Sequence, residues 1–351
     1  MQDTDQLYMT RAIALARLGA GQVAPNPMVG AVLVHDNRII GEGWHQKFGQ
    51  AHAEVNCINS VSPENQSLIA AATLYVTLEP CAHFGKTPPC SDLIIQQKIH
   101  KVVVGCTDPF PEVAGKGIRK MRDAGIEVVT GVLEKECRDL NKRFFTWVIQ
   151  KRPYIILKWA QTANGKIAGV SNERLLISNE YTNRRVHQWR SEEASILVGT
   201  HTALQDNPAL TNRLWEGKNP VRMVLDMSLR LPPTLKLFDQ EARTIVFNDI
   251  REEERGMIFF KKISNNRDVL QQILDACYQM GLQTILVEGG SRLLKSFIEQ
   301  GLWDEARVIS NETMRVPHGL AAPSLGGQQP VATEKILSDV IQYYVRIPDN
   351  D

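Results

Sequence analysis

Short apolar runs rich in β-branched residues alternate with stretches of helical periodicity in the first part of the chain. The runs predicted to form strands are 29–34, 39–43, 73–78, 101–105 and 126–130. The stretches predicted to form helices are 53–60, 91–98, 117–124 and about 133–147. Strands that alternate with helices favour an α/β sheet with helices on its faces.

Pro153 interrupts this alternation, because proline cannot continue a helix and biases the preceding residue away from one. We therefore place the boundary near 148–152, with a first domain over 1–148 and a second over 152–351. The second domain is again α/β. Its predicted strands are 154–160, 195–199, 222–226, 244–248, 284–288, 305–310 and 340–347, and its predicted helices are 179–190, 269–280 and 291–300. Apart from the strand 340–347, the segments 250–268 and 311–351 carry no clear pattern.

Composition narrows the class of protein. The chain has 351 residues, of which 43% are hydrophobic, and a net charge of +1, so no overall attraction to nucleic acid is implied. No apolar stretch is long enough for a membrane span, and the N-terminal segment is amphipathic, unlike a signal peptide. Six cysteines are too few for a disulfide framework, so we expect a cytoplasmic protein that binds neither nucleic acid nor a membrane.

Three short pieces of the first domain carry candidate metal ligands: His52-Ala53-Glu54, Pro80-Cys81 and Cys90. Zinc binds thiolate sulfur and imidazole nitrogen in a tetrahedral shell, and a catalytic zinc keeps one position open for water. One histidine and two cysteines leave that position open. We therefore predict a Zn²⁺ site formed by His52, Cys81 and Cys90.

The general signature of zinc deaminases is H-x-E followed by P-C-x-x-C, with a glutamate that is not a ligand. Glu54 matches this glutamate and is the predicted catalytic acid and base, because deamination requires a carboxylate that moves the proton of the water to the ring nitrogen and the leaving amine. Here the second cysteine follows the first by nine residues. The loop between them would bring Lys86 and Thr87 near the site, where they could contact a phosphate.

Other interpretations of these residues are open. They could be unrelated core side chains or a purely structural zinc site. A deaminase that acts on nucleic acid is disfavoured by the near-neutral charge of the chain. His83 is interpreted as a substrate contact or a solvated loop residue instead of a fourth ligand. Asn26, in a rigid turn, is a candidate contact to a base edge, although a plain turn asparagine is equally consistent with the sequence.

Taken together, His52-Ala53-Glu54, Thr77-Leu78-Glu79-Pro80-Cys81 and Gly85-Lys86-Thr87-Pro88-Pro89-Cys90 resemble one family: the bifunctional deaminase–reductases of riboflavin biosynthesis. In the second domain, the segment 206–213 and Val287-Glu288-Gly289-Gly290 also fit that family. The resemblance implies a cytidine-deaminase-like α/β/α domain followed by a dihydrofolate-reductase-like α/β domain. It also implies deamination of a phosphorylated pyrimidine and then reduction of its ribosyl chain to ribityl with NADPH.

The resemblance assigns residues of the second domain to two groups. Ala160, Thr202, Asp206 and Gly290 would face NADPH. Arg190, Leu210, Arg213 and Glu288 would face the phosphorylated substrate. Without the resemblance, the residues are only weak evidence for a cofactor site. No G-x-G-x-x-G follows a strand, so a Rossmann dinucleotide site is not supported, and Gly289-Gly290 before a helix is often only a turn. Lys158 and Glu288 are candidates for substrate contact or proton supply, and the sequence does not separate NADPH from NADH.

Three positions depart from the pattern of the family: Asn164, where aspartate is usual; Leu176, with Arg174, where a tryptophan and a serine are common; and Met227, where serine is common. These departures leave a second hypothesis open, namely a deaminase with a degenerate reductase domain. We expect a homo-oligomer, either a dimer or a tetramer, although the sequence does not fix its size.

Overall fold

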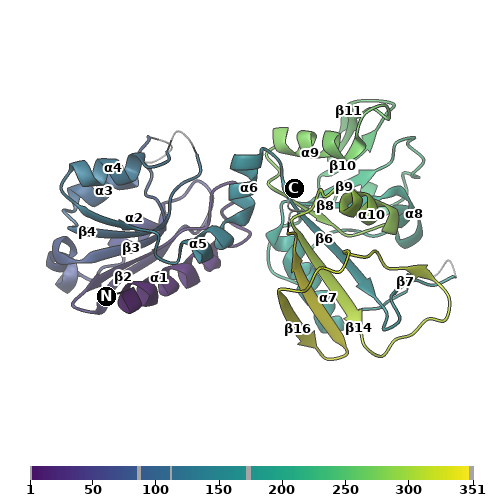
Figure 1. Ribbon diagram of the computed structural model, residues 1–351. Coiled ribbons are helices and arrows are strands. Elements are labelled where there is room, and N and C mark those ends of the chain that lie inside the picture. Colours follow the sequence, from purple (N-terminus) through teal and green to yellow (C-terminus); the bar gives the residue numbers. More distant parts are fainter. Residues whose placement is uncertain (1, 85–87, 111–112, 171–174, 348–351) are drawn as a thin grey trace. The chain divides into compact units, whose positions relative to one another are not determined.

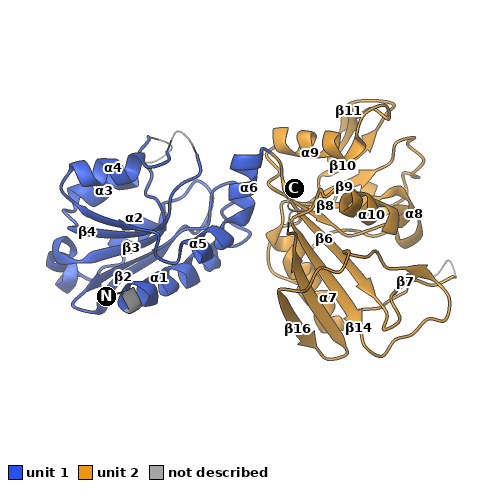
Figure 2. Ribbon diagram, in the orientation of Figure 1, with its two compact units in different colours: residues 1–151 blue, residues 152–351 orange. Residues whose placement is uncertain are grey.

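The computed structural model of the protein describes residues 2–84, 88–110, 113–170 and 175–347. The chain divides into two compact units, Met1–Lys151 and Arg152–Asp351 (Figure 2). Each unit is built around its own sheet (Figure 1). No helix in the described part of the chain is both long and apolar enough to cross a membrane.

The sheet of the first unit has five strands in the order β2-β1-β3-β4-β5. Their bounds are β1 Gly30–His35, β2 Arg38–Trp44, β3 Thr73–Leu78, β4 Lys101–Cys106 and β5 Glu127–Thr130. The helices are α1 Gln2–Ala16, α2 Ala53–Asn59, α3 Cys90–Gln96, α4 Lys116–Asp123, α5 Glu134–Leu140 and α6 Lys142–Gln150. Strands β3, β4 and β5 pair in parallel, whereas β1 is antiparallel to both its neighbours.

Alternating side chains of these strands build two cores, one on each face of the sheet. Leu33 packs with residues of α2, α3 and α4, whereas the adjacent Val32 packs with residues of α1, α5 and α6. This alternation follows from the two-residue period of a strand. The first unit is therefore an α/β/α sandwich, as predicted.

The second unit has a ten-stranded sheet in the order β11-β12-β10-β9-β8-β13-β6-β14-β17-β16. Its strands are β6 Tyr154–Gln161, β8 Ser195–Gly199, β9 Val221–Leu225, β10 Thr244–Asn248, β11 Glu253–Arg255, β12 Ile258–Lys262, β13 Thr284–Val287, β14 Glu305–Asn311, β16 Ala332–Ile336 and β17 Asp339–Val345. The short strands β7 Lys166–Ala168 and β15 Leu320–Ala321 pair separately. The helices are α7 Glu180–Glu192, α8 Thr200–Asp206, α9 Val269–Gln279 and α10 Ser291–Glu299.

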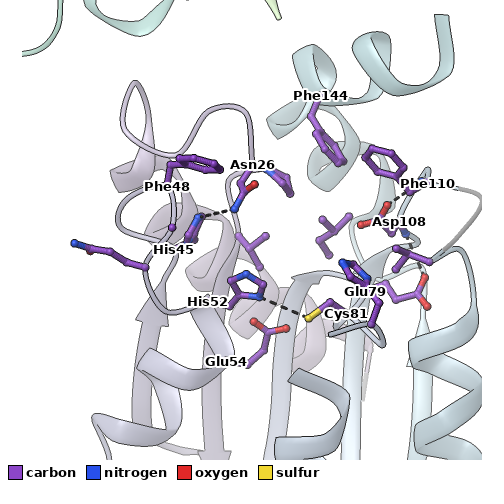
Figure 3. Close-up of a pocket in the computed structure, with 17 residues that line it drawn as sticks. Asn26, His45, Phe48, His52, Glu54, Glu79, Cys81, Asp108, Phe110 and Phe144 are labelled. Carbon is purple, nitrogen blue, oxygen red and sulfur yellow. Dashed lines mark hydrogen bonds between the residues drawn. The ribbon is translucent and has the colours of Figure 1, made fainter. Parts of the chain in front are cut away.

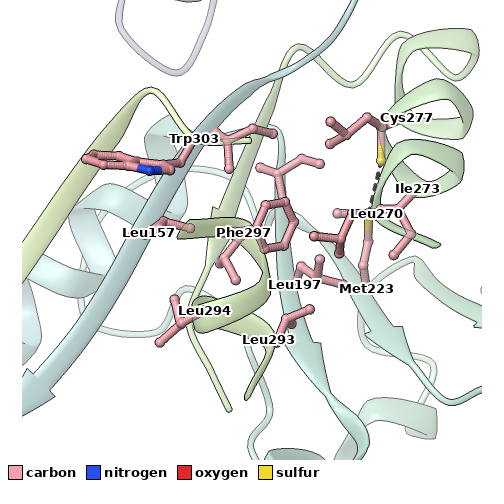
Figure 4. Packing of buried hydrophobic residues seen from close by; sticks show 14 of the residues in the cluster. Leu157, Leu197, Met223, Leu270, Ile273, Cys277, Leu293, Leu294, Phe297 and Trp303 are labelled. Carbon is pink, nitrogen blue, oxygen red and sulfur yellow. Dashed lines mark hydrogen bonds between the residues drawn. The ribbon is translucent and has the colours of Figure 1, made fainter. Parts of the chain in front are cut away.

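Helices α9 and α10 cover one face of this sheet. Phe297 of α10 and Ile273 of α9 are fully buried against Leu197 and Met223 of the strands (Figure 4). Helices α7 and α8 supply side chains such as Trp189 to the core on the opposite face. The second unit is therefore also a three-layer α/β structure.

Each predicted strand is present to within about two residues at either end. The predicted helix 133–147 is wrong in one respect, because Asn141 divides it into α5 and α6. The Asn141 side chain accepts from the N–H of Met28 and donates to its carbonyl, both at 2.8 Å, and this pairing fixes the break. Helix α8 and strands β7, β11, β12, β15 and β16 were not predicted.

Candidate zinc and substrate sites

Three side chains from separate elements meet at one end of the first sheet. His52 directly precedes α2 and Cys81 follows β3 (Figure 3), and Cys90 begins α3. The Nδ1 atom of His52 lies 3.7 Å from the sulfur of Cys81 and 3.4 Å from that of Cys90, and all three candidate ligand atoms lie within 4.8 Å of one another. Tetrahedral zinc bonds of ordinary length separate nitrogen and sulfur ligands by about 3.6 Å. The three residues therefore fit a zinc ion.

The ionisation of Cys81 also suits a metal ligand. Hydrogen bonding with Cys90, assisted by His52, outweighs burial and lowers the pKa of the Cys81 thiol to about 4. The backbone N–H of Cys90 also donates to the Cys81 sulfur over 3.3 Å. Because thiolate is the form that binds metal, Cys81 is prepared to act as a ligand at neutral pH.

Glu54 lies on the first turn of α2, two residues after His52, and its side chain is only 3% exposed. Burial, reinforced by the negative charge of the Cys81 thiolate, raises the pKa of Glu54 to about 7, whereas His52 acts in the opposite direction. A carboxyl group with a pKa near neutral can both accept and donate a proton efficiently. Glu54 therefore has the electrostatic environment of a general acid and base.

A cavity of about 420 Å³ opens beside these residues. Its polar lining includes Asn26, His45, His83 and Asp108, and Phe48, Phe110 and Phe144 are among its apolar lining residues (Figure 3). His83 lies in this lining and outside the three-residue ligand cluster. The predicted phosphate contacts Lys86 and Thr87 lie outside the described residues.

His45 orients Asn26. The Nδ1 atom of His45 lies 3.1 Å from the carbonyl oxygen of Ala51, so this nitrogen carries the proton. Its Nε2 atom then accepts from the amide nitrogen of Asn26, 3.2 Å away. This arrangement turns the amide oxygen of Asn26 away from His45, so that it can accept a hydrogen bond from a ligand (Figure 3).

The role of His45 was not predicted from the sequence. His45 directly follows β2, a position from which its side chain reaches the cavity. Nor was a role of its own predicted for Glu79. The Glu79 carboxylate accepts the N–H groups of Asp108, Gly115, Gly117 and Ile118 over 2.9–3.3 Å. A Cβ on Gly117 would stand 2.0 Å from the carbonyl oxygen of Pro80, so this close approach requires glycine. Glu79 therefore fixes the loop that carries Asp108 into the cavity.

In the second unit, two of the predicted substrate residues, Arg190 and Glu288, form a buried ion pair. Glu288, directly after β13, accepts from Nε and Nη2 of Arg190 at 2.8 Å each, and Lys158 lies 3.6 Å from the same carboxylate. Arg190 also donates to the carbonyl of Thr211. Burial opposes ionisation of Glu288, but Arg190 and Lys158 outweigh it and hold the pKa at about 2.

Only some of the residues predicted to face a nucleotide cofactor lie close to one another. Thr202 lies beside the turn that begins α10: a Cβ on Gly289 would stand 2.8 Å from the Thr202 side chain, and Gly290 has a φ of 78°. Asp206 ends α8, the helix that contains Thr202, and Ala160 lies on β6. The structure therefore brings Thr202 and Gly290 together, whereas no described contact joins Ala160 to them.

Comparisons with known proteins agree for both units. Residues 2–106 match the family described as the cytidine and deoxycytidylate deaminase zinc-binding region, and residues 153–314 match the RibD C-terminal domain. The riboflavin biosynthesis protein RibD of Actinobacillus pleuropneumoniae is 42% identical, over 95% of this chain and 88% of its own length. The chain belongs to the RibD family. RibD of Aquifex aeolicus is 41% identical over 88% of this chain and 87% of its own.

Solved RibD structures share the whole fold. A diaminohydroxyphosphoribosylaminopyrimidine deaminase/5-amino-6-(5-phosphoribosylamino)uracil reductase from Thermotoga maritima superposes with a TM-score of 0.89 at 39% identity, covering 99% of both chains. RibD of Acinetobacter baumannii gives 0.87 at 31% identity, covering 98% of this chain and 99% of the other. The chain thus combines a zinc-binding deaminase with a RibD reductase, both of which are enzymes.

The departures from the RibD pattern give no sign of a degenerate reductase. Asn164 accepts from the Thr162 hydroxyl and donates to the carbonyl of Val316, each over 2.8 Å, so it orders its turn. Met227 packs against the core beneath α9 and α10. Leu176 is exposed, and Arg174 lies outside the described residues.

Proposed function

We propose that the chain catalyses two consecutive steps of riboflavin biosynthesis. The first is hydrolytic deamination of a diaminohydroxyphosphoribosylaminopyrimidine, and the second is reduction of its ribosyl chain to ribityl with NADPH. The observation that carries the first step is the fit of His52, Cys81 and Cys90 to zinc beside the buried Glu54. The Thermotoga maritima relative, a deaminase/reductase 39% identical over nearly the whole chain, supports the pair of reactions.

The deaminase is assigned to 1–148. Zinc, when bound, lowers the pKa of a coordinated water and so supplies the nucleophile. Glu54 takes the proton released by the water and passes it to the ring nitrogen, and it then takes the proton of the newly added hydroxyl group and passes it to the departing amine. The amide oxygen of Asn26 accepts from the donor edge of the pyrimidine, and the phenylalanines of the cavity shield the ring from water. Lys86 and Thr87 are proposed to contact the phosphate.

The reductase is assigned to 152–351. Ala160, Thr202, Asp206 and Gly290 are proposed to contact NADPH, and the backbone N–H groups at the start of α10, directly after Gly290, suit its phosphates. The substrate is proposed to contact Leu210, Arg213 and Glu288. Arg213 is exposed and suits a phosphate, whereas the buried Arg190 orients Glu288 toward the substrate.

Two further properties belong to this proposal. A cytoplasmic location is proposed, which suits six cysteines that form no disulfide with one another. A dimer or tetramer is proposed, and sedimentation of the purified protein would measure its size.

A matched pair of variants tests the deaminase assignment. Glu54→Gln should lower the deamination rate by about 10²–10⁴-fold while zinc stays bound and reduction of separately supplied deaminated substrate continues. Glu64→Gln, which alters an exposed glutamate of the same unit, should change neither activity. Deamination by the Glu54→Gln protein at the rate of the unaltered enzyme would show that another group moves the proton.

A further inference from the structure

His187 lies on α7, one turn before Arg190, and is buried with 6% of its surface exposed. Its Nδ1 atom accepts a hydrogen bond from the backbone N–H of Arg213 over 2.9 Å. The two residues are far apart in the sequence, so this bond ties α7 to the loop after α8. Neither the sequence motifs nor the proposed reaction gives His187 a role.

The bond to Arg213 defines the state of the imidazole. A ring nitrogen that accepts an N–H carries no proton, so His187 is neutral with its proton on Nε2. Burial, together with the cations Arg190 and Arg213, lowers the pKa of His187 to about 4, against the smaller opposing effects of Glu288 and of hydrogen bonding with the Asn212 side chain. The acceptor at Nδ1 therefore persists throughout the neutral range.

The loop that His187 holds is strained and needs such support. Leu210 is buried and has a φ of 54°, a left-handed conformation that costs a residue other than glycine about 1 kcal/mol or more. On either side, Arg222 donates to the carbonyl of Ala209 and Arg190 donates to that of Thr211. These two bonds hold carbonyl groups, whereas His187 holds the N–H of Arg213.

We infer that His187 is a positioning residue of the reductase, which fixes the main chain at Arg213 so that its guanidinium meets the phosphate of the substrate. The inference rests on the proposed function, because Arg213 is a proposed substrate contact. Arg213 itself is exposed, and its Nη1 donates to the Thr211 hydroxyl over 2.9 Å. With both the main chain and the side chain held, the guanidinium loses little further freedom on binding.

Two substitutions separate this role from simple packing. His187→Phe keeps a ring but removes the acceptor, which leaves the Arg213 N–H without its partner. His187→Asn is smaller, but it places an amide oxygen near the position of Nδ1. We expect His187→Phe to raise the KM for the deaminated substrate about tenfold with little change in kcat or in the KM for NADPH. His187→Asn should stay close to the unaltered enzyme.

A double substitution tests whether His187 acts through Arg213. If it does, adding His187→Phe to Arg213→Ala should raise KM no further than Arg213→Ala alone. The deaminase activity of each variant, measured on the same chain, reports whether the first unit remains intact. Additive effects, or a His187→Asn protein as impaired as His187→Phe, would assign His187 a purely structural role and overturn the inference.

Limited trypsin digestion gives a readout that does not depend on the reaction. Trypsin cuts after arginine, so cleavage after Arg213, mapped by mass spectrometry, measures how firmly this loop is held. His187→Phe should be cut there several times faster than the unaltered chain and His187→Asn. Equal cleavage rates for all three would overturn the inference, whereas faster cleavage of His187→Phe together with no reductase turnover by the unaltered enzyme would contradict the proposed function alone.

Discussion

Replacing Glu288 by glutamine removes the negative charge that faces the buried guanidinium of Arg190. The Glu288 side chain is 6% exposed and that of Arg190 11%, and two hydrogen bonds of 2.8 Å join them. The substitution keeps the size of the side chain. It leaves Arg190 charged and buried, with only an amide oxygen to face.

The pKa of Glu288 gives the magnitude. A fall from its ordinary value of 4.5 to about 2 corresponds to about 3 kcal/mol of stabilisation. Because the pKa is lower in the folded state than in the unfolded state, this contribution is complete above about pH 5 and is lost as the pH falls toward about 2. At about pH 3 roughly 1.4 kcal/mol should remain.

Urea unfolding of both proteins, followed by circular dichroism at neutral and at acid pH, measures this difference. Glu334→Gln is the control, since Glu334 pairs with Arg185 at a half-exposed position of the same unit and should contribute about 1 kcal/mol or less. A Glu288→Gln difference of about 1 kcal/mol or less at neutral pH, or one that does not shrink in acid, would refute the reasoning.

Two further predictions concern the metal and the reductase core. Cys90→Ser should lower the zinc content and abolish deamination while reduction continues, because the thiolate is lost from the ligand cluster; full zinc content by atomic absorption would contradict the assignment. Arg222 is fully buried and donates to Thr244, Asp239 and three carbonyl groups, so Arg222→Leu should destabilise the second unit by about 3–5 kcal/mol in urea unfolding, and Arg222→Lys by less. An Arg222→Leu protein as stable as the unaltered protein would show that the loops that Arg222 joins keep their conformation without its hydrogen bonds.

The fold was largely predictable because long runs with a two-residue or helical period determine which face is buried. Leu33 and Val32 illustrate this, because adjacent residues of a strand point to opposite faces of the sheet and so belong to different hydrophobic cores. The missed elements lack such a period. Strand β11 is short and mostly exposed, and α8 follows β8 with no intervening turn residue to mark its start.

The candidate zinc ligands were predictable from the sequence, since His52-Ala53-Glu54 and Pro80-Cys81 follow the deaminase signature and Cys90 follows at the start of a helix. His45 and Glu79 were not, because their roles depend on contacts with Ala51 and Gly117 that only the folded chain makes. His187 is a third example: its partner Arg213 is distant in the sequence, and the bond joins a side chain to a main-chain group that carries no sequence signal.

The most direct test of the account is the identity of the products made by the purified, zinc-loaded protein from the pyrimidine substrate, with and without NADPH. Without NADPH, mass spectrometry should find a product in which an amino group has been replaced by oxygen and the ribosyl chain is intact. With NADPH, that product should gain two hydrogens as NADPH is consumed. An unchanged substrate, or a deaminated product that never consumes NADPH, would contradict the two-step function.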